Sequence, residues 1–171
     1  LKKSQRLQQV QTENGRIFLG FENTAELLTL QRDSATGQLI LSAPVKAVSA
    51  FGLWHVDPNG QYAYLFDANY TRLWSQPINP SIALQPYWQH ALGSSSKTFV
   101  VDPMGRYLFV TDEVRQRIHV YGFRRNDGPN IYERHSYGSP FSTLENPSAL
   151  AIDRGGQWLV VTSAKQRQLT T

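Results

Sequence analysis

The stretch Asp102–Glu113, which reads DPMGRYLFVTDE, decides the fold. A tight-turn sequence, Pro103–Arg106, is followed by a run of aromatic and branched residues, Tyr107–Thr111, that is typical of a β-strand. Gly105 accepts the positive φ that a short hairpin turn requires. The stretch therefore predicts two antiparallel strands joined by a tight turn.

The same pattern recurs along the chain. The aligned glycines are separated by 45, 45 and 51 residues: Gly15, Gly60, Gly105 and Gly156. Repetition at this spacing indicates one recurring unit of supersecondary structure, and no segment shows helical periodicity. Three of the turns begin with an aspartate, namely Asp57, Asp102 and Asp153. We interpret these aspartates and the neighbouring arginines as structural, because Asp caps turns and a repeated residue serves every unit alike.

Four strands can be assigned within one repeat. In the third repeat they are Thr98–Asp102, Tyr107–Asp112, Ile118–Phe123 and Ile131–Tyr137. A four-stranded antiparallel meander of this length is the blade of a β-propeller. The sequence predicts an all-β fold, with residues 1–171 forming one partial propeller domain. Its blades span approximately 7–47, 52–92 and 98–137, and a half-blade of two strands spans 148–171.

About three and a half blades do not close a ring, and a half-blade leaves an open strand edge. We therefore expect the remaining blades of the ring to lie outside this chain. Because the chain begins with Leu1, any targeting segment is expected to lie outside it too. A cytoplasmic and a periplasmic location both stay open.

Composition and motifs exclude several classes of site. The absence of cysteine excludes disulfides, thiolate metal sites and a cysteine nucleophile. No apolar run is long enough to predict a membrane span, and a net charge of +4 does not indicate nucleic-acid binding. The histidines lack metal-ligand spacing, and neither a Gly-x-Ser-x-Gly elbow nor a phosphate-binding glycine loop occurs. We expect no metal and no cofactor.

The stretch Asp102–Glu113, with Ile118–Tyr121 (IHVY) after it, resembles the lactonase-type propeller repeat, which is close to the YVTN repeat. The resemblance covers residues 7–171. It implies a seven-bladed ring, and the family includes bacterial 6-phosphogluconolactonase and fungal muconate-lactonising enzymes. In the latter, the resemblance implies a His, an Arg and a Glu around the channel mouth. Glu113 matches the Glu, Lys97 takes the place of the Arg, and the His position falls near Phe51-Gly52.

One face of the predicted propeller carries most of the loop charge. The loops between second and third strands share this face with the inter-blade connections, and their basic residues are Lys46, Arg72, Lys97, Arg115, Arg117, Lys165 and Arg167. We expect an anionic ligand at the mouth where Arg72, Lys97, Arg115 and Arg117 converge, with Glu113 close by. The plainer interpretation is that exposed loops carry charged residues. His55 is a further candidate ligand-binding residue, because it lies in a strand that is expected to line the channel, where other repeats have Val100 and Ala151.

Three functions stay open. The first is a non-catalytic module that binds an anionic small molecule or a protein partner at the mouth, and it is favoured because no catalytic constellation is visible. The second is a lactone hydrolase, in which Glu113 acts as acid or base beside Lys97. The third is a purely structural array of blades.

Overall fold

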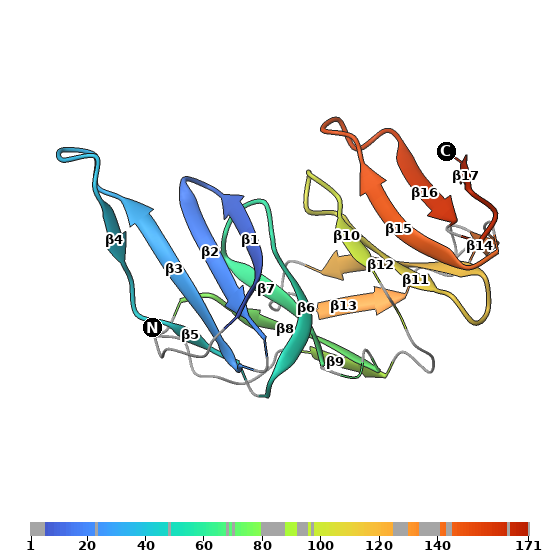
Figure 1. The fold of residues 1–171 in the computed structure, drawn as a ribbon, viewed down its shortest axis with the longest axis horizontal. Helices are drawn as coiled ribbons and strands as arrows, with labels where there is room; N and C mark the ends of the chain where they lie inside the picture. Colours follow the sequence, from blue (N-terminus) through green and yellow to red (C-terminus); the bar gives the residue numbers. More distant parts are fainter. Residues whose placement is uncertain are drawn as a thin grey trace.

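The computed structural model describes residues 6–22, 24–47, 49–67, 69, 71–79, 88–91, 96, 98–124, 130–133, 141–142, 145–163 and 165–170. Within these ranges every regular element is a strand, and the strands form four antiparallel sheets. The sheets fan out around a common centre, with β1, β6, β10 and β15 innermost (Figure 1). The all-β, bladed fold predicted from the sequence is confirmed. The described part of the chain contains no helix of the length and apolarity that crossing a bilayer requires.

The first two blades follow the predicted meander. Blade 1 consists of β1 (Leu7–Glu13), β2 (Arg16–Phe21), β3 (Glu26–Arg32), β4 (Leu39–Leu41) and β5 (Val45–Lys46). Blade 2 consists of β6 (Phe51–Val56), β7 (Tyr62–Asp67), β8 (Arg72–Pro77) and β9 (Trp88–Ala91).

The third and fourth blades repeat this order. Blade 3 consists of β10 (Phe99–Val101), β11 (Tyr107–Asp112), β12 (Arg117–Arg124), β13 (Asn130–Glu133) and β14 (Phe141–Ser142). Blade 4 consists of β15 (Pro147–Ile152), β16 (Leu159–Ser163) and β17 (Gln168–Thr170).

Three details differ from the sequence prediction. In blade 3, β13 pairs with the end of β12 and β14 pairs with its beginning, so two strands form the outer edge where one was predicted. The outer strand of blade 1 is split, because β4 pairs with the end of β3 and β5 pairs with its beginning, and Pro44 between them has no N–H to donate. Blade 4 has a third strand, β17, where two strands were expected. Its short sequence QLT carries one apolar residue and therefore shows no alternation to recognise.

The repeated turns have the structural role that the sequence indicates. The aligned glycines all have positive φ, between +63° and +72°. Asp57 Oδ1 accepts the backbone N–H groups of Gln61 and Tyr62 at 2.6 and 2.7 Å. Asp153 caps its own turn in the same way, and the backbone hydrogen bond from Trp158 is the main cause that lowers the pKa of its carboxyl.

The hydrophobic core lies between the blades. Between blades 1 and 2 it contains Phe18, Leu27 and Trp54, and Gly20 packs so closely against the Trp54 indole that a Cβ there would overlap it. A second cluster joins blades 2 and 3: Tyr64, Phe66, Leu73, Val101, Leu108, Val110 and Tyr121. Burial of this kind fixes the order of the blades and therefore places their loops on a common face.

Candidate functional site

The loop face is the face formed by the loops between second and third strands, residues 22–25, 68–71, 113–116 and 164–167. In three blades the last residue of the second strand caps this loop. Asp67 accepts the N–H groups of Thr71 and Arg72, and Asp112 accepts that of Arg115 at 2.9 Å. Ser163 Oγ accepts the N–H of Gln166 at 3.1 Å. These caps were not predicted from the sequence, although Asp67 and Asp112 are 45 residues apart, which is the spacing of the repeated turns.

Blade 3 adds a polar cluster to its cap. The Asp112 carboxylate is buried, with a side chain 1% exposed, and its Oδ2 lies 3.1 Å from Arg115 Nη1 and 3.4 Å from His119 Nε2. A buried carboxylate requires such partners, because burying its charge alone is costly. We call Asp112, Arg115 and His119 the Asp112 cluster.

The Asp112 cluster does not recur in the preceding blade. His119 pairs with Val110, and the equivalent pair in blade 2 is Trp74 with Leu65. Asp67, the equivalent of Asp112, therefore has a tryptophan at the position of the imidazole. Residues that form the blade recur from repeat to repeat, so a cluster that the preceding blade lacks is a candidate functional site rather than part of the repeated structure.

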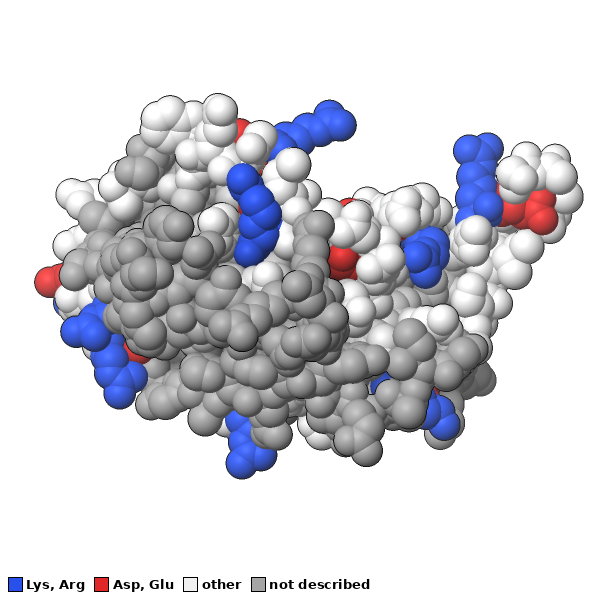
Figure 2. All heavy atoms as spheres, turned by 180° about the vertical axis from the view of Figure 1, so that it is seen from behind, with Lys and Arg blue, Asp and Glu red and all other residues white. Residues whose placement is uncertain are grey.

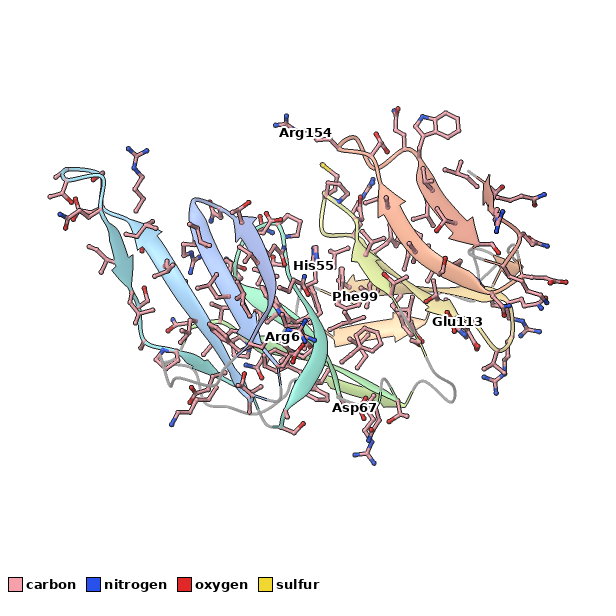
Figure 3. The ribbon with its side chains drawn as sticks, viewed as in Figure 1. Arg6, His55, Asp67, Phe99, Glu113 and Arg154 are labelled. Atoms are coloured by element: carbon pink, nitrogen blue, oxygen red, sulfur yellow. The ribbon has the colours of Figure 1, made fainter. Side chains whose placement is uncertain are left out.

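The predicted binding residues of blade 3 lie next to this cluster. Glu113 follows Asp112 directly and is partly exposed (Figure 3). The Arg115 side chain is 50% exposed while it pairs with Asp112. Arg117 was predicted in the loop, but it is the first residue of β12, pairs with Asp112 in the ladder, and is exposed.

Three further basic residues of the predicted loop face do not join the Asp112 cluster in the described part of the chain. Arg72 is exposed at the start of β8, and within the described ranges no hydrogen bond or ion pair links its side chain to blade 3. Lys97 lies outside the described residues. Lys165 is already paired with Glu145 at 2.8 Å. On the face drawn in Figure 2, the Lys and Arg side chains stand apart rather than forming one patch.

His55 lies away from the loop face. Phe51 pairs with Asp67 at the loop end of blade 2, whereas His55 pairs with Tyr64 further along β6. Four residues of strand separate the two positions, a distance of about 13 Å. The His55 ring lies edge-on to Phe99 with centroids 6.1 Å apart, and Figure 3 shows the two side by side near the centre of the arc.

Burial lowers the pKa of His55 to about 4, so its imidazole is neutral at pH 7. Its Nε2 lies 3.5 Å from Gln11 Nε2, which places the ring between the innermost strands of blades 1 and 3. The structure does not bring His55 together with Glu113, Arg115 and Arg117. Among the described residues, no three His, Asp or Glu side chains are grouped so that they could hold a metal ion.

The chemistry available at the loop face of blade 3 follows from these groups. The guanidinium of Arg115 has five N–H donors, and a buried carboxylate fixes its position. Arg117 adds a second cation within the same loop and strand start. Glu113 and His119 are groups that can accept a proton.

Comparisons with known proteins address the fold. No model of a known protein family matches the sequence, and no curated protein matches it. A candidate 6-phosphogluconolactonase of Bacteroides fragilis superposes with a TM-score of 0.70 at 12% identity, over 99% of this chain and 52% of that one. A candidate 6-phosphogluconolactonase of Bacteroides uniformis gives 0.68 at 13% identity, over 97% and 53%.

A periplasmic gluconolactonase of Pseudomonas aeruginosa gives a TM-score of 0.69 at 13% identity, over 96% of this chain and 49% of that one. The chain thus spans about half the length of these structures. Together with the bladed sheets and their inter-blade cores, the superpositions show that the chain has the fold of the lactonase-type β-propellers.

Proposed function

We propose that the loop face of blade 3 binds a small anionic molecule of the sugar-acid or lactone type. The observation that carries the proposal is the Asp112 cluster, in which a buried carboxylate holds the half-exposed Arg115 by both its backbone N–H and its side chain. An arginine positioned in this way can offer its other N–H groups to a carboxylate or phosphate with little loss of side-chain entropy. Arg117 adds a second positive charge to the same site. This matters because a single exposed ion pair contributes little to the binding of an anion.

The test is titration with gluconate 6-phosphate by calorimetry at low and at high salt. The double variant Arg115→Gln/Arg117→Gln is expected to weaken binding by about tenfold or more at low salt, and added salt is expected to weaken binding by the parent protein. Arg154→Gln is the matched control, because Arg154 is an exposed arginine in a turn of blade 4 (Figure 3). Equal affinity of the double variant and the parent for gluconate 6-phosphate would contradict the proposal.

The second candidate function is lactone hydrolysis, which the contact between Asp112 and His119 favours. A carboxylate that orients an imidazole is the arrangement used to position a general base. In this proposal His119 or Glu113 takes a proton from water as the water oxygen attacks the lactone carbonyl. Arg115 stabilises the resulting oxyanion, and the protonated His119 or Glu113 returns the proton to the ring oxygen as the ring C–O bond breaks. The names of the superposed lactonases agree with this chemistry.

Ring opening of glucono-δ-lactone, followed in a pH-stat, tests the hydrolase. The chain is expected to open the lactone faster than buffer, and His119→Gln or Glu113→Gln is expected to lower that rate while gluconate 6-phosphate still binds. A rate equal to that of buffer would exclude the hydrolase and leave the binding proposal standing.

We also propose that further blades of the same kind complete the ring. Apolar side chains are exposed on the two outermost blades: Leu39, Ile40 and Leu41 at 52–59%, Trp158 at 61% and Leu169 at 62%. Exposed apolar surface of this kind is typical of faces that pack against another element. Solution scattering of the chain alone is expected to show an open arc or self-association, and a monomeric closed disc would contradict the proposal.

A further inference from the structure

A groove of about 530 Å³ opens between blades 1 and 2. In blade 1 its lining residues come from the beginning of β2, from β3, and from the chain between β4 and β5 with the first residue of β5. In blade 2 they come from the turn between β6 and β7, from the first residue of β7, and from the end of β8 with the two residues after it. That turn lies at the opposite end of the strands from the loop face, so the groove is separate from the Asp112 cluster. Its polar lining includes Arg16, Thr29, Gln31, Ser42 and Gln61. The volume is that of a small-molecule site.

Arg16 is the charged residue of this lining, and it is partly buried. Its Nη2 donates to the carbonyl of Gly60 at 3.0 Å, and its guanidinium carbon lies 5.8 Å from the centre of the Phe18 ring. Within the described ranges its side chain forms no ion pair with a carboxylate. The contacts of the Arg16 guanidinium among the described residues are thus with neutral groups, and Glu13, opposite Arg16 in the β1–β2 hairpin, forms no ion pair with it.

Comparison of the repeated turns shows that blade 1 lacks the aspartate that pairs with the turn arginine in blade 3. Arg106 is the equivalent arginine of blade 3, and its side chain forms two hydrogen bonds with Asp102, at 2.7 and 3.3 Å. In blade 1 the position of Asp102 is occupied by Thr12, which lies opposite Ile17 as Asp102 lies opposite Tyr107. Blade 2 keeps the aspartate but has Gln61 in place of the arginine. Among these three turns, only blade 1 has the cation without its carboxylate, and the groove opens there.

A second group in the lining also has unused hydrogen-bonding capacity. Thr29 is 4% exposed, and its hydroxyl has no hydrogen-bond partner in the described part of the chain. Gln31 and Ser42 add an amide and a hydroxyl to the same wall, while Tyr62 and Ile78 supply the apolar part. A partly desolvated guanidinium is stabilised by a carboxylate, and the neighbouring amide and hydroxyl groups suit a ligand with hydroxyls of its own.

We propose that this groove binds a small hydroxylated carboxylate whose carboxylate group pairs with Arg16, as the Asp102 carboxylate pairs with Arg106 in blade 3. The site is independent of the loop-face proposal, because it lies in other blades and uses no residue of the Asp112 cluster.

Calorimetric or ligand-observed NMR titration of the full chain with glucuronate tests the proposal, with glucose as the neutral analogue. Arg16→Gln is expected to weaken glucuronate binding by about tenfold or more, since it removes the ion pair. Thr12→Asp restores the carboxylate of the repeat beside Arg16 and is expected to weaken binding to a similar extent. Thr12 is exposed, so this second variant tests the idea without disturbing the core.

A matched control and a change of background separate this site from others. Arg154→Gln is expected to leave glucuronate affinity unchanged. Because the loop face is itself proposed to bind sugar acids, the titrations are repeated in the Arg115→Gln/Arg117→Gln background, where Arg16→Gln is still expected to weaken the binding of glucuronate that remains. Binding of glucose as tight as that of glucuronate, no binding by the parent chain, or unchanged affinity in both Arg16→Gln and Thr12→Asp would each overturn the proposal.

Discussion

The side-chain amide of Gln11 closes a ring of two hydrogen bonds with the backbone of Val56. Gln11 Nε2 donates to the Val56 carbonyl at 2.9 Å, and the Val56 N–H donates to Gln11 Oε1 at 2.9 Å. Gln9 Nε2 donates to the Trp54 carbonyl at 3.1 Å, two residues earlier. Strand β6 pairs with β7 on one side, so these glutamines of β1 supply partners on its other, inner edge. They join blade 1 to blade 2 and protect an edge that could otherwise pair with a foreign strand.

Replacing Gln11 by alanine is expected to lower the free energy of unfolding by about 1–3 kcal/mol, because a buried N–H and a buried carbonyl lose their partners. Val56 is 0% exposed in the parent chain, so Gln11 supplies its backbone groups with hydrogen-bond partners that water does not supply there. Gln11→Glu keeps the acceptor for the Val56 N–H but turns a carboxylate oxygen toward the Val56 carbonyl and toward Glu13, whose Oε1 lies 3.2 Å from Gln11 Nε2. It is therefore expected to destabilise the chain at least as much as alanine does. Urea unfolding midpoints measure the series.

Thr12→Ala is the control for this prediction, because Thr12 is the next residue of β1 and is exposed. It is expected to change stability by less than about 0.5 kcal/mol. If Gln11→Ala were no more damaging than Thr12→Ala, the two hydrogen bonds would contribute nothing measurable to the joint between the blades.

His55 makes stability depend on pH. Its pKa is about 4 in the folded chain because burial disfavours the imidazolium, and the pKa of an unfolded histidine is about 6.5. The unfolded chain therefore binds more protons between these values. Protonation of His55 therefore leaves the free energy of unfolding unchanged above about pH 6.5. It lowers that free energy progressively as the pH falls toward about 4, and it lowers it no further below that pH.

Urea midpoints of the parent and of His55→Gln, measured from pH 7.5 to pH 4, test this dependence. The parent is expected to lose stability more steeply than the variant across that window, by about 1.4 kcal/mol for each unit of pKa difference at most. Parallel curves for the two proteins would show that protonation of His55 is not coupled to unfolding.

Much of the fold was predictable because it depends on local signals. The turn glycines and the runs after them specify the hairpins, and the aspartates before them cap their own backbone. The third strand of blade 4 was not predictable, because β17 is short and exposed and its three residues show no strand pattern. It becomes recognisable as a strand only through its pairing with β16. The Gln11–Val56 bonds were missed for a similar reason, since alternating glutamines in an edge strand look like a solvated face.

The candidate site was predictable only in part. Glu113, Arg115 and Arg117 could be placed on the loop face, because the meander puts all loops of one kind together. The contact between Asp112 and His119 depends on the register of β11 against β12, which the sequence does not state. Arg16, which has no carboxylate ion-pair partner among the described residues, did leave a sequence signal, namely Thr12 where blade 3 has Asp102.

Gly156 and Gly15 are expected to respond differently to alanine. Both have positive φ, so both variants share a backbone strain of about 1–2 kcal/mol. A Cβ on Gly15 meets nothing within 4 Å, whereas a Cβ on Gly156 would lie 2.5 Å from Asp102 Oδ1 and 3.2 Å from Arg106 Nη2. Gly156→Ala must therefore also disturb the pair between Asp102 and Arg106. The thermal unfolding midpoint of Gly156→Ala is expected to lie well below that of Gly15→Ala. Equal decreases of the two midpoints would show that backbone strain alone determines the loss of stability.

Thr29→Val is expected to stabilise the chain by about 1 kcal/mol, because it replaces a buried hydroxyl that has no partner in the described residues by a methyl group of similar shape. Valine also suits the interior of β3.

The matched control is Thr111→Val in β11. The Thr111 hydroxyl donates to the Thr98 carbonyl at 3.1 Å and accepts the Thr98 N–H at 3.1 Å, so the same substitution there is expected to destabilise by about 1–3 kcal/mol. Urea midpoints of the two variants should therefore move in opposite directions from the parent. A loss of stability in Thr29→Val would show that its hydroxyl does have a partner in solution, such as a bound water in the groove.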